Sequence, residues 1–205
     1  MPSVELPHSS ATAADSTNEN LPARTTLLQR HAVQLLEPPD VHQLSAAIGW
    51  LELGNAVESE AELRQLSAPA ADHPDALEVW FALHAHRRDW PAALPVAERL
   101  VTVAPERASG WLHRAYALRR VPGGGLQAAW DALLPASKMF RSELTIPYNL
   151  ACYSCQLGRI EEAWKWFRKA IRKREQERIV AMALADPDLE PLHRRIAETY
   201  DDIPF

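Results

Sequence analysis

The stretch that decides the fold is YNLACYSCQLGRIEEAWKWFRKA, residues 148–170. Two runs with helical spacing flank a turn at Leu157-Gly158-Arg159. The same kind of turn occurs at Leu53-Gly54-Asn55 and Arg88-Asp89-Trp90, and a looser copy is Val121-Pro122-Gly123-Gly124-Gly125. The step from Gly54 to Arg88 is 34 residues, and the 70 residues from Arg88 to Gly158 make two steps of about 35. A near-constant step of this size predicts an array of stacked helix pairs.

The composition is that of a globular protein made of helices. The chain has 205 residues, of which 47% are hydrophobic and 24% are charged, with 7 Gly against 16 Pro. Pro ends helices and Gly weakens their interiors, so few Gly and many Pro suit helices that stop abruptly. Runs of alternating β-branched residues are missing from the sequence. We therefore predict an all-α protein.

Charge and hydrophobicity exclude several classes of partner. The net charge is −5, whereas proteins that bind nucleic acids or anionic membranes carry clustered Lys and Arg. No run approaches the roughly 18 apolar residues of a membrane helix, and no basic segment followed by an apolar run opens the sequence. We expect a cytoplasmic protein with no nucleic-acid and no membrane partner.

Turn and stop signals divide the chain into a tail, four helix pairs and a cap. Residues 1–24 are rich in Ser, Thr, Ala, Asn and Pro, and we expect them to be a disordered tail. The repeat domain, residues 25–205, opens with a short predicted helix from Thr25 to Glu37, which Pro38-Pro39 end. The predicted pairs span residues 40–67, 75–104, 106–140 and 146–175, and the predicted cap spans residues 176–205.

Individual helix limits follow from caps and breakers. Asp40 is the predicted N-cap of the first array helix, and Ala68-Pro69 is the predicted stop of its partner. Pro91 suits the first turn of a helix, because the N–H that it lacks is not needed there. After the Gly triplet, one continuous helix is predicted from Leu126 to Phe140.

Residues 148–170 resemble a tetratricopeptide repeat. In that pattern a small residue follows a Leu on the first helix, and the second helix carries an Ala, an aromatic residue and a second Ala in turn. Here Ala151 is the small residue of the first helix, and Ala163, Phe167 and Ala170 are the three residues of the second. Helices that cross about 8–10 Å apart need small side chains at the crossing, which Ala151 and Ala163 supply. The resemblance implies a right-handed superhelical array of antiparallel helix pairs, an α-solenoid with a C-terminal capping helix.

The segment Ala185–Leu192 resembles the end of bacterial chains whose last repeat carries an Asn-Leu-Ala-Cys run, which is Asn149–Cys152 here. We interpret this segment as part of a cap that covers the last apolar face, as a repeat array requires for solubility. Asp186 and Asp188 are interpreted as caps of helix termini.

The other three pairs match the repeat pattern less fully. Ser59 stands in the first pair where Ala is usual. In the second pair Phe81 falls at the position of the small residue on the first helix. The alternative is that this helix is shorter by about three residues, with Trp80 at the leading aromatic position of the pattern. The matching positions are Ala47, Trp50 and Leu63 in the first pair, Ala93 and Pro105 in the second, and Trp111, Ala115, Ala129 and Leu133 in the third. We expect four Trp to fill the interior, namely Trp50, Trp111, Trp130 and Trp164.

In tetratricopeptide arrays the first helix of each pair lines a concave groove that takes a peptide or a partner helix. The resemblance places nine residues in that groove: Glu78, His86, His113, Tyr116, Arg120, Tyr148, Asn149, Cys152 and Gln156. It implies a non-enzymatic scaffold that binds a protein or peptide without a cofactor, as a monomer or weak homo-oligomer. Two alternatives stay open: a secretion-type chaperone of an unstable client, and a self-associating structural protein.

Cysteine and histidine patterns invite a redox or metal interpretation, and their context favours packing. Cys152 and Cys155 lie inside a predicted helix, whereas a redox pair sits at a helix N-terminus, and zinc would need two further ligands. His84 and His86 are two residues apart on a helix and point to different faces, so with His113 they are not expected to form a metal site. We predict neither a metal nor a catalytic residue.

The strongest cluster of charge is basic. It comprises Lys165, Arg168, Lys169, Arg172, Lys173, Arg174 and Arg178, interleaved with Glu161, Glu162, Glu175 and Glu177. If the glutamates pair with the cations at helical spacing, this run is a solvated outer face. The alternative is a site for an acidic partner.

Overall fold

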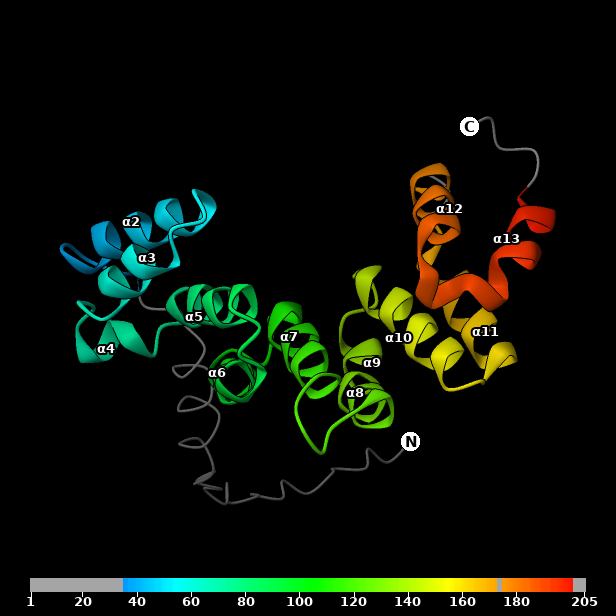
Figure 1. Ribbon diagram of the computed structural model, residues 1–205, viewed down its shortest axis with the longest axis horizontal. Coiled ribbons are helices and arrows are strands. Elements are labelled where there is room, and N and C mark those ends of the chain that lie inside the picture. Colours follow the sequence, from blue (N-terminus) through cyan, green and yellow to red (C-terminus); the bar gives the residue numbers. More distant parts are fainter. Residues whose placement is uncertain (1–34, 173–174, 201–205) are drawn as a thin grey trace, which may run out of the picture. The chain divides into compact units, whose positions relative to one another are not determined.

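The computed structural model describes residues 35–172 and 175–200, and these residues contain helices and no strand. The predicted tail, residues 1–24, lies outside the described residues, as does most of the helix predicted from Thr25 to Glu37. The helices are α2 (Asp40–Glu52), α3 (Ala56–Leu63), α4 (Ala68–Ala71), α5 (Pro74–His86), α6 (Trp90–Val103), α7 (Ala108–Leu118), α8 (Leu126–Leu133), α9 (Ala136–Met139), α10 (Thr145–Gln156), α11 (Ile160–Ala170), α12 (Gln176–Ala185) and α13 (His193–Thr199), with the 3₁₀ helix η1 (Pro187–Leu192) before α13 (Figure 1).

Four helix pairs follow one another along the chain: α2 with α3, α5 with α6, α7 with α8, and α10 with α11. The first helices of the first three pairs begin at Asp40, Pro74 and Ala108, a step of 34 residues each time. The next begins at Thr145, 37 residues on, because the Gly triplet and the extra helix α9 lengthen the third unit. The described residues therefore form an all-α solenoid.

The turns inside the pairs repeat one hydrogen-bonding pattern. Gly54, Arg88 and Gly158 have φ of 77°, 57° and 75°, the left-handed conformation that closes a helix. In each turn the next residue donates its N–H to a carbonyl five residues back, with N···O distances of 2.8 to 2.9 Å; the pairs are Asn55 to Trp50, Asp89 to His84 and Arg159 to Ser154. The recurring turn signal in the sequence is thus a recurring helix-terminating motif.

Small side chains fill the crossings between paired helices. Ala151 on α10 and Ala163 on α11 are fully buried in one core cluster, as the repeat pattern predicts. In the second pair Phe81 takes the place of a small residue, and α5 keeps the 13-residue length of α2, so the shortened-helix alternative is wrong. The Phe81 ring is accommodated because the side chains around it are small, namely Ala93, Ala97 and Ala117.

Three predicted limits of the first and third pairs differ from the structure. Asp40 is the first helical residue rather than the N-cap, which is Pro39, and its carboxylate accepts hydrogen bonds from the Ser67 N–H and hydroxyl at 2.7 and 2.6 Å. Ala68-Pro69 opens α4 instead of ending α3, because Pro is well placed in a first turn. The helix predicted from Leu126 to Phe140 breaks into α8 and α9 around Pro135, which has no N–H to continue it.

The predicted interior position of Trp50 is also wrong. Its side chain keeps 37% of its surface exposed, whereas Trp164 keeps 7% and Trp111 and Trp130 are half-buried. Trp50 belongs to the first helix pair of the described residues, where no preceding described pair packs against it.

The last described elements cover the end of the array. α12, η1 and α13 pack on one another, and η1 contacts both α10 and α11 (Figure 1). Asp186 caps η1 by accepting a hydrogen bond from the Asp188 N–H at 2.9 Å. Leu189, Leu192 and Ile196 are fully buried in the same cluster as Ala163. Among the described residues, no helix has the combination of length and apolar character needed to cross a bilayer.

Candidate protein-binding groove

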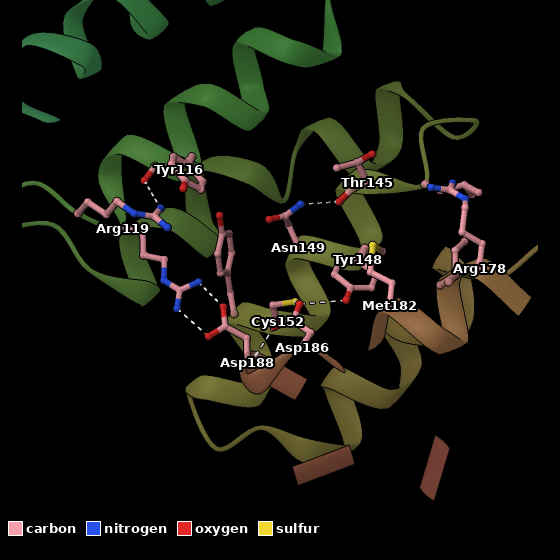
Figure 2. A pocket seen from close by; sticks show the side chains of 14 residues that line it. Tyr116, Arg119, Thr145, Tyr148, Asn149, Cys152, Arg178, Met182, Asp186 and Asp188 are labelled. Carbon is pink, nitrogen blue, oxygen red and sulfur yellow. Dashed lines mark hydrogen bonds and ion pairs between the residues drawn. The ribbon is translucent and has the colours of Figure 1, made fainter. Parts of the chain in front are cut away.

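Three pockets lie along the first helices of the pairs, and together we call them the groove. The N-terminal pocket, about 470 Å³, lies between α2, α5 and α7. The middle pocket, about 320 Å³, lies between α5, α7 and α10. The C-terminal pocket, about 380 Å³, lies between α7, α10, α12 and the segment that contains η1 (Figure 2). Each pocket is therefore built from neighbouring first helices, and the last one also from the cap.

The structure brings most of the predicted groove residues to these pockets. Glu78 and His113 line the N-terminal pocket, and His113 also lines the middle one. Tyr116 and Asn149 line both the middle and the C-terminal pockets. Arg120, Tyr148 and Cys152 line the C-terminal pocket. His86 and Gln156 line none of the three.

A half-buried carboxylate organises the N-terminal pocket. Glu78 accepts a hydrogen bond from the Ser109 hydroxyl, and its other oxygen lies 2.6 Å from His113 Nε2. Burial alone would raise the pKa of Glu78, but the hydrogen bonds from His113 and Ser109 outweigh it and lower that pKa. The His113 ring stacks on Phe81 with centroids 4.0 Å apart, which fixes its orientation. This pocket presents a stabilised negative charge beside apolar side chains of α2.

An aromatic stack with an arginine stands where the middle and C-terminal pockets meet. The guanidinium of Arg120 lies 3.4 Å from the centroid of the Tyr116 ring and 5.2 Å from that of the Trp90 ring. The two rings meet edge to face at 5.5 Å, and Arg120 donates to the Tyr116 carbonyl at 2.9 Å. Tyr116 nevertheless keeps 41% of its surface exposed. We call these three residues the aromatic stack; it is rigid, amphipathic and accessible.

The cap occupies the other wall of the C-terminal pocket. Arg119 on α7 forms a two-pronged ion pair with Asp188, with Nη2 to Oδ1 at 3.0 Å, and this hydrogen bonding raises the pKa of Arg119 (Figure 2). The Tyr148 hydroxyl donates to Asp186 at 2.9 Å, and Gln156 donates to the Asp188 carbonyl at 3.3 Å. Tyr148 and Gln156 thus hold the chain's own cap, and Tyr148 is only 9% exposed.

The ionisable groups beneath the cap are held in their neutral forms. Burial raises the pKa of the Cys152 thiol, and the carboxylates of Asp186 and Asp188 raise it further. Burial likewise raises the pKa of Cys155 to about 11, and it raises the pKa of the Tyr148 hydroxyl above its usual range. Both cysteines are free and buried. A protonated thiol is a poor nucleophile and a poor metal ligand, so packing and hydrogen bonding are what these groups do here.

Two residues in or beside the groove escape sequence reasoning. Trp90 lies in a predicted turn and is the first residue of α6; it lines none of the three pockets, yet its ring joins the aromatic stack. Arg119 precedes a predicted groove residue, but its partner Asp188 lies 69 residues further along the chain. The signals in the sequence that point to this region are the repeat resemblance and the i, i+4 spacing of Tyr116 and Arg120.

Among the described residues, no group of three or more His, Cys, Asp or Glu side chains is placed to hold a metal ion. His84 lies against Trp80, with ring centroids 5.7 Å apart, and burial lowers the pKa of His84. His113 is engaged with Glu78. These histidines therefore have separate surroundings.

Several solved structures are similar to this chain. MamA AMB-1 is 22% identical, with a TM-score of 0.52 over 62% of this chain and 69% of that chain. A second structure of MamA is 14% identical, with a TM-score of 0.59 over 76% of this chain and 87% of that one. A Podosopora anserina protein described as a kinesin light chain, with nearly identical TPR-like repeats, is 17% identical, with a TM-score of 0.54 over 82% of this chain and 100% of that one.

The chain thus has the fold of a tetratricopeptide-type repeat protein, as the resemblance of residues 148–170 predicts. At identities of 14 to 22%, the likeness is one of fold. No protein-family model matches the chain, and the comparison with curated proteins gives no match.

Proposed function

We propose that this protein is a non-enzymatic scaffold that binds a peptide segment of a partner protein in the groove. The observation that carries the proposal is the aromatic stack of Trp90, Tyr116 and Arg120, in which Tyr116 lines the middle and C-terminal pockets and Arg120 lines the C-terminal one. Rigid aromatic and Arg side chains at the centre of a concave surface are the residue types that dominate binding energy at interfaces. The likeness of fold to other helical repeat proteins supports a scaffold in general terms.

The charges of the groove suggest how such a peptide would lie. The N-terminal pocket offers the Glu78 carboxylate beside apolar side chains, and the aromatic stack offers the guanidinium of Arg120. No carboxylate of the described residues forms an ion pair with Arg120. A peptide with a basic residue toward the N-terminal pocket and an acidic residue at the aromatic stack fits both ends.

A peptide selected from a random library tests this proposal directly. We would pan a phage-displayed library on the full chain and measure the binding of the selected peptide by fluorescence anisotropy. Replacing Tyr116 and Arg120 together with Ala should weaken binding about tenfold or more, because both side chains act as anchors. Circular dichroism should be unchanged, since neither side chain is fully buried.

The matched control is Arg159→Ala. Arg159 also lies over a Trp ring, that of Trp130 at 5.5 Å, but it lines none of the three pockets. We expect this control to bind the peptide as the wild type does. If the library yields no binder, or if the Tyr116 and Arg120 changes leave binding intact, the groove is not the binding surface.

Self-association and a secretion-type chaperone role are the alternatives. Leu53 and Val57 of the first pair are exposed apolar side chains that self-association would bury, but the aromatic stack favours peptide binding in the groove, which is the function that we propose. The cytoplasmic location of the protein and its lack of catalytic activity stay predictions from the sequence.

A further inference from the structure

A second cleft lies on the side of the second helices, away from the groove. It has a volume of about 510 Å³ and is formed by the end of α8, by α9, by the loop that leads into α10, by the first turn of α10 and by α11. Its walls combine apolar and basic side chains: Leu134, Ser137, Lys138, Phe140, Arg141, Glu143, Pro147, Trp166 and Lys169. We call it the basic cleft; none of its lining residues lines the groove pockets.

The apolar part of the basic cleft is recessed and its cations are exposed. Phe140 and Trp166 are half-buried, whereas Lys138, Arg141 and Lys169 are exposed. The Lys169 ammonium lies 3.9 Å from the centroid of the Trp166 ring, which holds this charge at the edge of the apolar wall. An apolar side chain would therefore enter between rings while charged groups of the same ligand stay at the rim.

The cations around the cleft have no carboxylate partner among the described residues. The sequence leaves open that neighbouring glutamates neutralise the basic run. Glu175 does pair inside that run, with Arg178, whereas Glu161 pairs with Arg195 and Glu162 with Arg159. Within residues 35–172 and 175–200 no ion pair engages Lys138, Arg141, Lys165, Arg168, Lys169 or Arg172.

Two further contacts define the electrostatics of the rim. Arg172 donates from Nη2 to the Arg141 carbonyl at 2.7 Å, so the Arg172 charge is held beside the backbone of the loop that leads into α10. Glu143 is the acidic residue of the lining, and its Oε1 accepts from the Thr145 N–H at 3.1 Å, at the start of α10. The Glu143 charge is thus directed to a helix N-terminus, and the rim remains basic.

The size of the site and the charge of the whole chain favour a peptide over other anions. The net charge of −5 repels an extended polyanion or an anionic bilayer outside this one patch. A bilayer favours protruding aromatic side chains, whereas Phe140 and Trp166 are recessed. A short acidic segment needs only the patch itself, and one of its side chains would fill the cleft.

We propose that the basic cleft binds an acidic peptide segment of a partner protein, with one aromatic or large aliphatic side chain seated between Phe140 and Trp166. Asp or Glu residues on either side of that anchor pair with Lys138, Arg141 and Lys169. This surface is separate from the groove, so the inference does not depend on the function proposed for the groove.

The test uses a short fluorescein-labelled peptide in which a central Phe is flanked by Asp and Glu residues, with the full chain and fluorescence anisotropy as the readout. Replacing Lys138 and Lys169 together with Ala should weaken binding about tenfold or more. A second peptide with Gly in place of Phe should bind more weakly to the unmodified protein, because it cannot fill the cleft.

A charge-matched variant separates a site from general attraction. Arg64→Ala with Arg194→Ala removes the same charge from side chains that are 72% and 91% exposed and lie outside the cleft. We expect this variant to bind the Phe peptide as the unmodified protein does. Far-ultraviolet circular dichroism should be the same for all variants, since every replaced side chain is on the surface.

Three results would overturn the proposal: no measurable binding of the Phe peptide, equal binding of the Phe and Gly peptides, or equal losses in the cleft and charge-matched variants. Tighter binding of oligothymidylate, or of vesicles of phosphatidylserine and phosphatidylcholine, would also overturn it and assign the cleft to that anion instead.

Discussion

Ser59 and Ser154 are both fully buried serines inside helices, and they differ in their hydrogen bonding. Ser154 Oγ accepts a hydrogen bond from the Trp130 indole N–H at 3.0 Å. Ser59 Oγ has no hydrogen-bond partner among the described residues. A buried hydroxyl without a partner costs about 1–3 kcal/mol. Ser59 is also the position where the repeat pattern has Ala.

We expect Ser59→Ala to leave the free energy of unfolding unchanged or to raise it by about 1 kcal/mol, since it removes the unpaired hydroxyl and restores a better helix former. Urea denaturation measures this. Ser154→Ala is the matched control and should lower stability by about 1–2 kcal/mol, because it leaves the Trp130 N–H unpaired. A loss of stability in Ser59→Ala as large as that in Ser154→Ala would mean that the Ser59 hydroxyl has a partner.

The three helix-terminating turns also differ at a single residue. Arg88 stands in the left-handed region where the other two turns have Gly, and its side chain is exposed. A left-handed conformation costs a non-Gly residue roughly 1–2 kcal/mol. Nothing among the described contacts of the Arg88 side chain offsets that cost.

Arg88→Gly should therefore stabilise the protein, by about 0.5–1 kcal/mol once the greater freedom of Gly in the unfolded chain is counted. Gly54→Ala is the reciprocal control: a Cβ there would meet no atom within 4 Å, so its cost is that of the backbone alone. It should destabilise by about 1 kcal/mol. Thermal melts that rank the two variants in the opposite order would contradict the conformational argument.

At the scale of elements, one half-buried ion pair helps to attach the cap to the array, beside the hydrogen bonds from Tyr148 and Gln156 and the apolar packing. The Arg119 and Asp188 side chains keep 24% and 26% of their surface, and they join α7 to η1. Arg99 and Asp72 form a similar pair in the second helix unit, but their side chains keep 49% and 45%. Burial strengthens a charged hydrogen bond and raises the cost of removing one partner.

We expect Asp188→Asn to lower the free energy of unfolding by about 1–3 kcal/mol. The control Asp72→Asn, which removes the same charge from the exposed pair, should cost less than about 1 kcal/mol. Denaturant melts of both variants make the comparison. Equal effects would show that the Asp188 pair contributes no more to attaching the cap than a surface pair does.

Elements also show how far the sequence predicts this structure. The predicted second helix of the fourth pair begins at Ile160, and α11 begins there, because the turn signal at Gly158 terminates the preceding helix locally. The break at Pro135 is a local signal that the continuous prediction for residues 126–140 passes over, since Pro cannot continue a helix. The prediction of Asp40 as a cap is wrong for another reason: its partner Ser67 lies 27 residues away. Long-range partners leave no local pattern.

In the candidate groove, too, some contacts are predictable from the sequence and others are not. Tyr116 and Arg120 are predictable as neighbours on one helix face, and they form the aromatic stack because i, i+4 residues meet there. Arg119 is not predictable, because its role depends on where the cap folds back. The binding role of the groove residues stays a prediction until a ligand is measured.

At the scale of the whole described molecule, the core is a series of clusters rather than one centre. One cluster joins α2, α3 and α5, from Leu44 to Leu83. Another joins α10, α11 and the cap, from Tyr148 to Ile196, and the two share no residue. In such an array stability is close to a sum of local units and nearest-neighbour interfaces.

Overpacking a single crossing should therefore loosen one part of the chain. Ala163→Leu places a larger side chain at the fully buried crossing of α10 and α11, which costs about 1–3 kcal/mol. Amide hydrogen exchange should speed up in α10, α11 and α12, while the amides of α2 and α3 keep their protection. Ala47→Leu, at a fully buried Ala of the first pair, should produce the reverse pattern. If either change accelerates exchange equally throughout, the array unfolds as one cooperative unit and its clusters are coupled more strongly than their separate composition implies.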